Sequence, residues 1–202
     1  MNGAIAKTGA MIVTVTVFLF AVFLITGFTF GSYFVCLILP IGFIMMTVGF
    51  YHERTAHNSA AALLGVIFAA VYSVLIMQVY FAQLTAVRLD DLNEQAMQIL
   101  DYSRGGLLFS YDLLGYGIMA LSTFFTGLSL KKRDKADKLL KILMLIHGVF
   151  FISCLIMPMT GLFKGMADGD TSSGGVAALV FWCIYFLPIG ILSFRHFCKK
   201  TQ

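Results

Sequence analysis

Charged side chains are scarce in this sequence. Of its 202 residues only 12% are Asp, Glu, Lys or Arg, whereas 59% are hydrophobic and the mean hydropathy is +0.90. A water-soluble domain of this size needs far more polar surface. The composition therefore argues against a soluble enzyme. The formal net charge is only +4, and the basic residues cluster in short loops, where membrane insertion alone explains them. We therefore expect no nucleic-acid partner.

Catalytic and cofactor motifs are also missing. The sequence has no HExxH, GxSxG or P-loop pattern, and its four cysteines form no CxxC pair. Of the four histidines, His52, His57 and His196 lie at or beyond the expected cytoplasmic boundary, so a haem group at His147 would lack a second axial ligand at matching depth. We expect no metal and no cofactor, and enzymatic activity is disfavoured.

Long apolar runs are what the sequence has instead. Six of them recur, each about 20 residues long, which suffices to cross roughly 30 Å of hydrocarbon as a helix. They predict an all-α polytopic membrane protein, a six-transmembrane-helix bundle that forms a single domain in the lipid bilayer. The expected spans are residues 9–28, 32–51, 60–87, 107–130, 139–163 and 176–197.

The basic residues predict an orientation for these spans. If the six spans alternate, eleven of the fourteen Lys and Arg residues fall on one side, and only Arg88, Arg104 and Lys164 fall on the other. Because cytoplasmic loops are enriched in Lys and Arg, both termini are expected in the cytoplasm, with the chain in the cell inner membrane. The basic run 131–141 is either part of this topology signal or a surface for anionic lipid.

The connections between the spans have distinct characters. Residues 29–31 are so few that the first two spans must form a tight antiparallel hairpin, helped by Gly27 and Gly31. Residues 89–100 have near-helical apolar spacing and predict a short amphipathic helix, either a cap on the bundle or a lid over an outward-facing cavity. Residues 165–175 have the composition of a mobile loop.

Three prolines fall inside predicted spans. Pro40, Pro158 and Pro188 interrupt the second, fifth and sixth spans respectively. Proline removes a backbone hydrogen bond and kinks a helix, although it is common in membrane helices without any function. Three kinked helices favour an internal cavity.

Asp112 is the only acid that we place inside a span, and such residues are functional candidates because their burial is costly. Tyr116 follows it one helical turn later on the same face. Gln78 and Gln83 lie in the outer half of the third span and are candidates for the opposite wall. The competing interpretation is that Asp112 is hydrated near the interface or caps a neighbouring helix.

His147 and Trp182 are two further candidates. His147 lies near the middle of the fifth span, where it is either a neutral hydrogen-bonded packing residue or a binding or proton-relay group. Trp182, in the outer half of the sixth span, belongs either to an interfacial aromatic belt or to the wall of a ligand site.

These observations lead to two functional hypotheses. The first is a small membrane protein that binds or transports a small molecule through an outward-facing intramembrane cavity. Its ligand-binding residues would be Asp112, Tyr116, Gln78, Gln83, His147 and Trp182. The second is a non-catalytic accessory, sensory or immunity-type membrane protein that acts through a membrane protein partner or as a homodimer.

Small residues recur every four positions in the third span, at Ala61, Gly65, Ala69 and Ser73, and such a ridge lets another helix approach closely. Internal packing is one use of this ridge and a partner helix is another. With Ala6 and Ala10 in the first span, the plan is similar to that of the substrate-binding subunits of energy-coupling-factor vitamin transporters. That resemblance implies six helices, cytoplasmic termini and a docked transmembrane partner. The very short first connection departs from their pattern.

Overall fold

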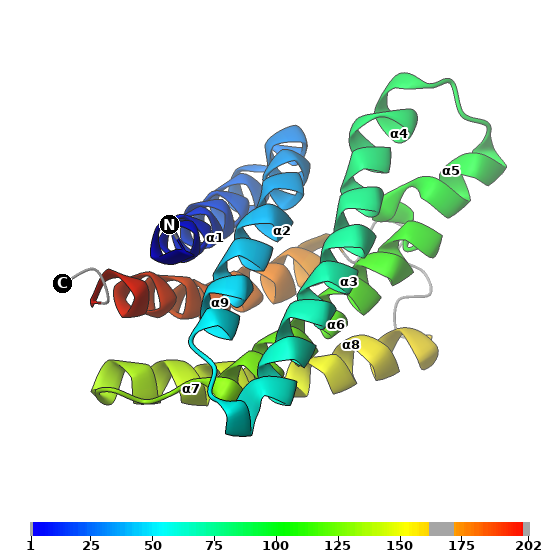
Figure 1. The fold of residues 1–202 in the computed structure, drawn as a ribbon. Helices are drawn as coiled ribbons and strands as arrows, with labels where there is room; N and C mark the ends of the chain where they lie inside the picture. The colour runs from blue at the N-terminus through cyan, green and yellow to red at the C-terminus, as the bar shows by residue number, and fades with distance from the viewer. Residues whose placement is uncertain (1, 162–171, 200–202) are drawn as a thin grey trace.

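All regular elements in the described part of the chain are helices. The computed structural model describes residues 2–161 and 172–199, and Figure 1 shows the course of the chain. The elements are α1 (Asn2–Thr26), α2 (Thr29–His52), η1 (Ala56–Asn58), α3 (Ser59–Leu84), α4 (Ala86–Leu89), α5 (Glu94–Leu100), η2 (Tyr102–Arg104), α6 (Leu107–Ser129), α7 (Lys135–His147), α8 (Val149–Met159) and α9 (Ser172–Cys198).

Six helical segments are long and apolar enough to cross a membrane, as the composition predicts. The third is lengthened because η1 and α4 continue α3, and the fifth consists of α7 followed by α8. The segments are Asn2–Thr26, Thr29–His52, Ala56–Leu89, Leu107–Ser129, Lys135–Met159 and Val176–Cys198. Their ends differ from the predicted ones by several residues, because apolar composition marks the hydrocarbon core and not the helix ends.

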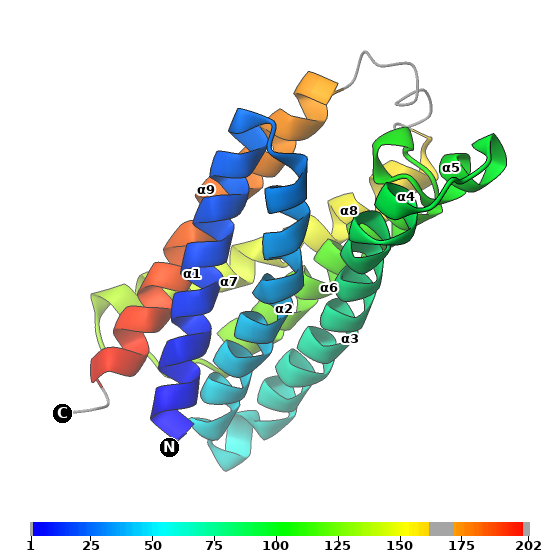
Figure 2. The same cartoon turned by 90° about the horizontal axis from the view of Figure 1, so that it is seen from above.

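The long helices pack as a ring. Helix α1 lies between α2 and α9, α2 packs on α3, α3 packs on α6, and α6 packs on α7 and α8. The contact between α7 and α9 closes the ring. Figure 2 shows the start of α1 and the end of α9 at one end of the bundle, with α4 and α5 at the other.

The distribution of side chains suits an apolar solvent. Large apolar side chains such as Phe18, Phe81 and Phe181 are exposed on the outside of the bundle. Polar side chains lie inside; they include Gln83, Asp112, Ser122, Thr123 and His147. Lipid makes no demand for a polar exterior, whereas polar groups in the hydrocarbon region need partners inside the protein.

The predicted hairpin between the first two spans is confirmed. Helix α1 ends at Thr26 and α2 begins at Thr29, so only Gly27 and Phe28 connect them. Gly27 has a φ of +70°, a left-handed conformation that glycine adopts without a steric penalty. The backbone amide of Phe28 donates to the carbonyl of Phe23 at 2.9 Å, which satisfies one of the last carbonyls of α1.

The expected interruption of the fifth span at Pro158 is wrong in position. Pro158 lies within α8, and the helix breaks ten residues earlier, at Gly148. Helices α2 and α9 continue through Pro40 and Pro188. At Gly148 a Cβ atom would stand 2.8 Å from the Phe124 ring, so the break coincides with a close approach to α6.

The small-residue ridge of α3 packs inside the bundle. A Cβ atom on Gly65 would stand 2.5 Å from the Thr126 hydroxyl of α6. The Ser122 hydroxyl donates to the Gly65 carbonyl at 2.7 Å, and the Ala69 side chain is buried. The ridge therefore lets the backbones of α3 and α6 approach closely. Of the two uses considered for this ridge, internal packing is the one observed.

The connection between α3 and α6 contains the short helix that the apolar spacing predicts. Helix α5 begins at Glu94, and the Asn93 side chain caps it by accepting a hydrogen bond from the Ala96 amide at 2.9 Å. Element η2 follows and ends at Arg104, and the next residue, Gly105, has a φ of +67°. Of the loop predicted at 165–175, residues up to 171 lie outside the described ranges, and α9 begins at Ser172.

The tight contact at Gly65 gives a stability prediction. We expect Gly65→Val to lower the free energy of unfolding by about 1–3 kcal/mol, because the added atoms force α3 away from α6. Ala70→Val, on the exposed side of the same helix, is the matched control and should have little effect. Denaturant unfolding of the purified protein in detergent measures both. Equal losses in the two variants would contradict the close packing of α3 on α6.

Candidate functional site

Asp112 lies in the second turn of α6 and is 1% exposed. Its Oδ2 atom accepts a hydrogen bond from the Tyr102 hydroxyl at 3.2 Å. Its other carboxylate oxygen, Oδ1, is buried and has no hydrogen-bond partner among residues 2–161 and 172–199. One oxygen of this carboxylate is therefore hydrogen-bonded within the protein, and the other is not.

Tyr102 is held over Asp112 by Gln83 of α3. The Gln83 side-chain amide donates to the Leu100 carbonyl at 2.7 Å and accepts from the Tyr102 backbone amide at 3.1 Å. Burial, reinforced by the negative charge of Asp112, raises the pKa of the Tyr102 phenol well above its usual value of 10.0. The phenol therefore stays protonated and remains a hydrogen-bond donor to Asp112.

Aromatic rings surround the carboxylate. The Tyr80 ring centroid lies 5.4 Å from that of Tyr33 and 6.1 Å from that of Tyr102. The Tyr80 phenol also lies near both the Asp112 carboxyl group and the Cys36 thiol. We call Tyr33, Tyr80, Tyr102 and Asp112 the Asp112 cluster; α2, α3, η2 and α6 each contribute one member.

Tyr116 extends this aromatic wall toward α9. Its ring centroid lies 4.9 Å from the Trp182 ring and 5.9 Å from the Tyr72 ring. Its hydroxyl group lies 3.9 Å from the Cys36 sulfur. The side chain is 7% exposed, so Tyr116 and Asp112 both face the interior, as their helical spacing predicts.

His147 is buried with both ring nitrogens hydrogen-bonded. The Trp182 indole donates to Nε2 at 3.2 Å, and Nδ1 lies 2.6 Å from the Thr123 hydroxyl oxygen. An indole N–H can only donate, so Nε2 must be unprotonated and the proton sits on Nδ1. His147 is thus a neutral packing residue in this arrangement. Trp182 is 6% exposed and lies inside the bundle, which does not fit the alternative of an interfacial belt residue.

Five of the six predicted ligand-binding residues lie in one connected interior region. Tyr102 links Asp112 to Gln83, and Trp182 links Tyr116 to His147 through an edge-to-face ring contact and a hydrogen bond. Asp112 and Tyr116 are buried one turn apart on α6 and join the two groups. Gln78 is not brought to this region, because its side chain is exposed while Gln83 is buried. The spacing of these two glutamines places them on different sides of α3.

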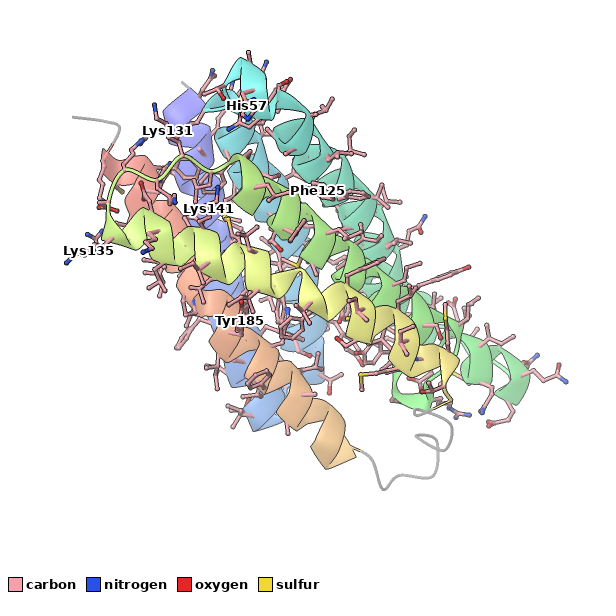
Figure 3. The ribbon with its side chains drawn as sticks, turned by 90° about the horizontal axis from the view of Figure 1, so that it is seen from below. His57, Phe125, Lys131, Lys135, Lys141 and Tyr185 are labelled. Carbon is pink, nitrogen blue, oxygen red and sulfur yellow. The ribbon has the colours of Figure 1, made fainter. Side chains whose placement is uncertain are left out.

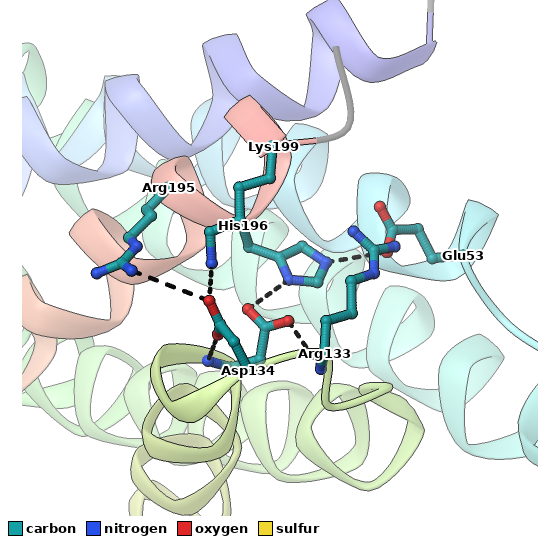
Figure 4. Close-up of polar contacts among 7 residues, drawn as sticks. Glu53, Arg133, Asp134, Arg195, His196 and Lys199 are labelled. Carbon is teal, nitrogen blue, oxygen red and sulfur yellow. Dashed lines mark hydrogen bonds and ion pairs between the residues drawn. The ribbon is translucent and has the colours of Figure 1, made fainter. Parts of the chain in front are cut away.

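A second polar cluster was not anticipated from the sequence. The His196 side chain is 1% exposed, with Nδ1 2.9 Å from an Asp137 carboxylate oxygen and Nε2 2.9 Å from a Glu53 carboxylate oxygen. Each contact needs an N–H, so the imidazole is doubly protonated and positively charged. Arg133 also donates to Glu53 at 2.7 Å. Figure 4 shows these contacts.

Ion pairs extend this arrangement toward the surface. Asp134 caps α7 by accepting from the Asp137 amide at 2.9 Å, and it pairs with Arg195 of α9 and with Lys199, which directly follows that helix. The Lys199 ammonium group holds the pKa of Asp134 at about 2, below its usual value of 3.8. We call Glu53, Arg133, Asp134, Asp137, Arg195, His196 and Lys199 the His196 cluster; it joins the end of α2, the start of α7 and the end of α9.

The His196 cluster has the geometry of a structural tie. The carboxylates of Glu53 and Asp137 lie on opposite ring nitrogens of His196 and do not converge on one point. Within the described ranges, no group of three or more His, Cys, Asp or Glu residues could hold a metal ion. Lys131 and Lys135 lie at the same end of the bundle, as does His57 (Figure 3). The acids of this end thus pair with His196 and with nearby basic groups, while these two lysines remain exposed.

No protein-family model, curated protein or solved structure matches this chain. The similarity to vitamin-transporter subunits is therefore limited to the general plan, and the residues on which it rests are used differently. Ala6 and Ala10 are buried inside the bundle. A Cβ atom on Gly49 of α2 would stand 2.3 Å from the Ala6 Cβ, so this face of α1 packs on α2.

The His196 cluster gives a second stability prediction. We expect His196→Leu to lower the free energy of unfolding by about 3 kcal/mol, because it removes the cation between two buried carboxylates. His57→Leu, at an exposed position in η1, is the matched control and should change stability by less than about 0.5 kcal/mol. Denaturant unfolding in detergent at neutral pH compares them. Similar stability of the two variants would show that the tie contributes nothing.

Proposed function

We propose that this chain is a small integral membrane protein that binds, and in its working cycle transports, a small molecule at the Asp112 cluster. The observation that supports the proposal is the unpartnered Oδ1 atom of Asp112. A buried carboxylate without full compensation costs several kcal/mol, so this arrangement works against stability. A bound molecule that supplies the missing partner would offset that cost.

The contrast with the other interior polar groups strengthens this argument. His147 has partners on both nitrogens, and Gln83 uses both ends of its amide. The other unpartnered buried side-chain atoms in the described ranges are the hydroxyl oxygens of Tyr72 and Ser193, which are neutral. Asp112 therefore carries the one carboxyl group on that short list.

The position of Asp112 supports access from the end of the bundle that carries α5. Tyr102 lies directly over the carboxylate, and Gln83 fixes the backbone on both sides of Asp101. A molecule that enters from this end must displace Tyr102 from Oδ2. We propose that this end is the mouth of an outward-facing cavity when that segment moves aside.

A role as an accessory protein has less support. The two small-residue faces that would dock a partner helix are already occupied, since Gly65 packs on Thr126 and Ala6 packs on Gly49. We therefore place the function in the interior of the bundle.

The proposed orientation puts both termini and the His196 cluster in the cytoplasm and α5 outside the cell inner membrane. It is supported by the eleven to three division of Lys and Arg residues. It also agrees with the structure in one respect: the start of α1 and the end of α9 lie at one end of the bundle (Figure 2).

Ligand retention tests the proposed function. Native mass spectrometry of the wild-type protein, extracted gently from its own membrane, should show a bound small molecule that is lost in Asp112→Asn. Asp90→Asn, at an exposed position in the same outer connection, should retain it. Absence of any bound molecule from the folded wild-type protein, or its full retention in Asp112→Asn, would refute the proposal.

Thiol labelling of intact cells tests the orientation. Gln95→Cys and Lys138→Cys place a thiol at exposed positions at opposite ends of the bundle. A membrane-impermeant maleimide should label the first in intact cells and the second only after permeabilisation. The wild-type chain, whose Cys36 and Cys183 are buried, gives the background. The reverse pattern would invert the topology.

A further inference from the structure

We infer that the molecule bound at the Asp112 cluster is a primary alkylammonium cation, an organic group that ends in –NH₃⁺. This inference rests on the proposed function and specifies its ligand class. It follows from three features of the cluster: its uncompensated charge, its missing hydrogen-bond donor and its aromatic walls.

The charge of Asp112 has no cationic partner within the described residues. The two basic side chains described at this end of the bundle, Arg88 and Arg104, are engaged elsewhere. Arg104 pairs with Glu94 and Asp101, and Arg88 lies over the Phe30 ring and donates to the Leu84 carbonyl. A cation from outside the described residues is therefore needed if the carboxylate is to be neutralised in its ionised form.

The hydrogen bonding of Asp112 specifies the kind of cation. Oδ2 already accepts from Tyr102, and Oδ1 is buried without a donor. A charged N–H group satisfies the acceptor and neutralises the carboxylate at once, because a charge-assisted hydrogen bond combines both contributions. A quaternary ammonium carries the charge and lacks the donor. A neutral alcohol carries the donor and lacks the charge.

The surrounding rings suit the organic part of such a cation. The rings of Tyr33, Tyr80 and Tyr102 pack against one another in tilted and edge-to-face arrangements, with centroids 5.4 to 6.1 Å apart. Aromatic faces attract ammonium groups through the negative potential of their π-systems, and they also pack well against alkyl chains. An anionic ligand would instead meet a carboxylate of like charge.

Thermal unfolding of the detergent-purified protein tests the ligand class, with n-butylammonium as the probe. At a concentration about 100-fold above its Kd, this cation should raise the unfolding temperature of the wild-type protein by roughly 5 °C or more. Two probes of similar size are the comparisons: tetramethylammonium, which has no N–H, and 1-pentanol, which has no charge. Both should give clearly smaller shifts, with ionic strength held constant by sodium chloride.

Asp112→Asn should abolish the shift with n-butylammonium, and Asp90→Asn should preserve it. Because every probe also meets the detergent micelle, the Asp112→Asn protein corrects for effects that do not involve the site. If that variant does not fold, the wild-type protein provides a second measurement. Modification of Asp112 by a hydrophobic carbodiimide, located by peptide mass spectrometry, should be slowed by n-butylammonium and not by 1-pentanol.

Equal stabilisation by all three probes, or none by n-butylammonium, would overturn the inference. These outcomes are separable from the fate of the proposed function. A neutral molecule that is retained in native mass spectra and lost in Asp112→Asn would leave the proposed function standing and the ammonium class refuted. If n-butylammonium gives no stabilisation and native mass spectra show no bound molecule, the proposed function is refuted as well.

Discussion

For six apolar helices that cross a bilayer, as we propose for this chain, one constraint governs the structure: the hydrocarbon core contains no water, so each polar group within the helices needs a partner in the protein. Most Ser and Thr hydroxyl groups find this partner within their own helix, by donating to a carbonyl one turn earlier. Thr14, Thr16, Thr47, Ser73 and Thr123 do so. Such bonds need no neighbouring helix. The longer polar side chains in the interior, such as Gln83 and His147, bond instead to other elements, and these bonds help to determine where the helices meet.

The two acidic clusters meet this constraint in opposite ways. In the His196 cluster Asp137 and Glu53 share the positive charge of an imidazolium, and Arg133 supports both by donating its guanidinium to Glu53 and its backbone amide to Asp137. Charge and hydrogen-bond donors are supplied together. In the Asp112 cluster the protein supplies only the phenols of Tyr102 and Tyr80 and no charge, and Oδ1 has no hydrogen-bond partner among the described residues. At the His196 end of the bundle the protein supplies cations for its buried carboxylates, and at the Asp112 end it supplies none. This difference favours a functional role for Asp112 over a role in packing.

Composition and periodicity were sufficient to predict the six spans, the first hairpin and the inward face of α6 that carries Asp112 and Tyr116. These features depend on local chain properties, which a single sequence contains. The His196 cluster could not be predicted, because its contacts join residues 59 and 143 positions apart in the chain. One signal was present: Asp134 and Asp137 are acids within a strongly basic run, where a pure topology signal needs none. Tyr102 was missed for a related reason, since it lies outside the spans and reaches Asp112 only because Gln83 fixes the connection.

The closure of the ring between α7 and α9 shows how these polar contacts shape the bundle. Elsewhere the helices approach through small residues, as at Gly65 and Gly49. Between α7 and α9 the contacts are hydrogen bonds: Tyr185 donates to the Leu143 carbonyl at 2.7 Å, Trp182 donates to His147, and His196 meets Asp137. In lipid, apolar surface gives no net drive for helices to associate, so hydrogen bonds and close packing must supply it. These three bonds follow α7 only as far as His147. Beyond Gly148 the chain continues as α8, which packs on α6, and α9 continues toward its own N-terminal end on the side of α1. The break at Gly148 therefore marks the point at which the fifth span leaves the sixth.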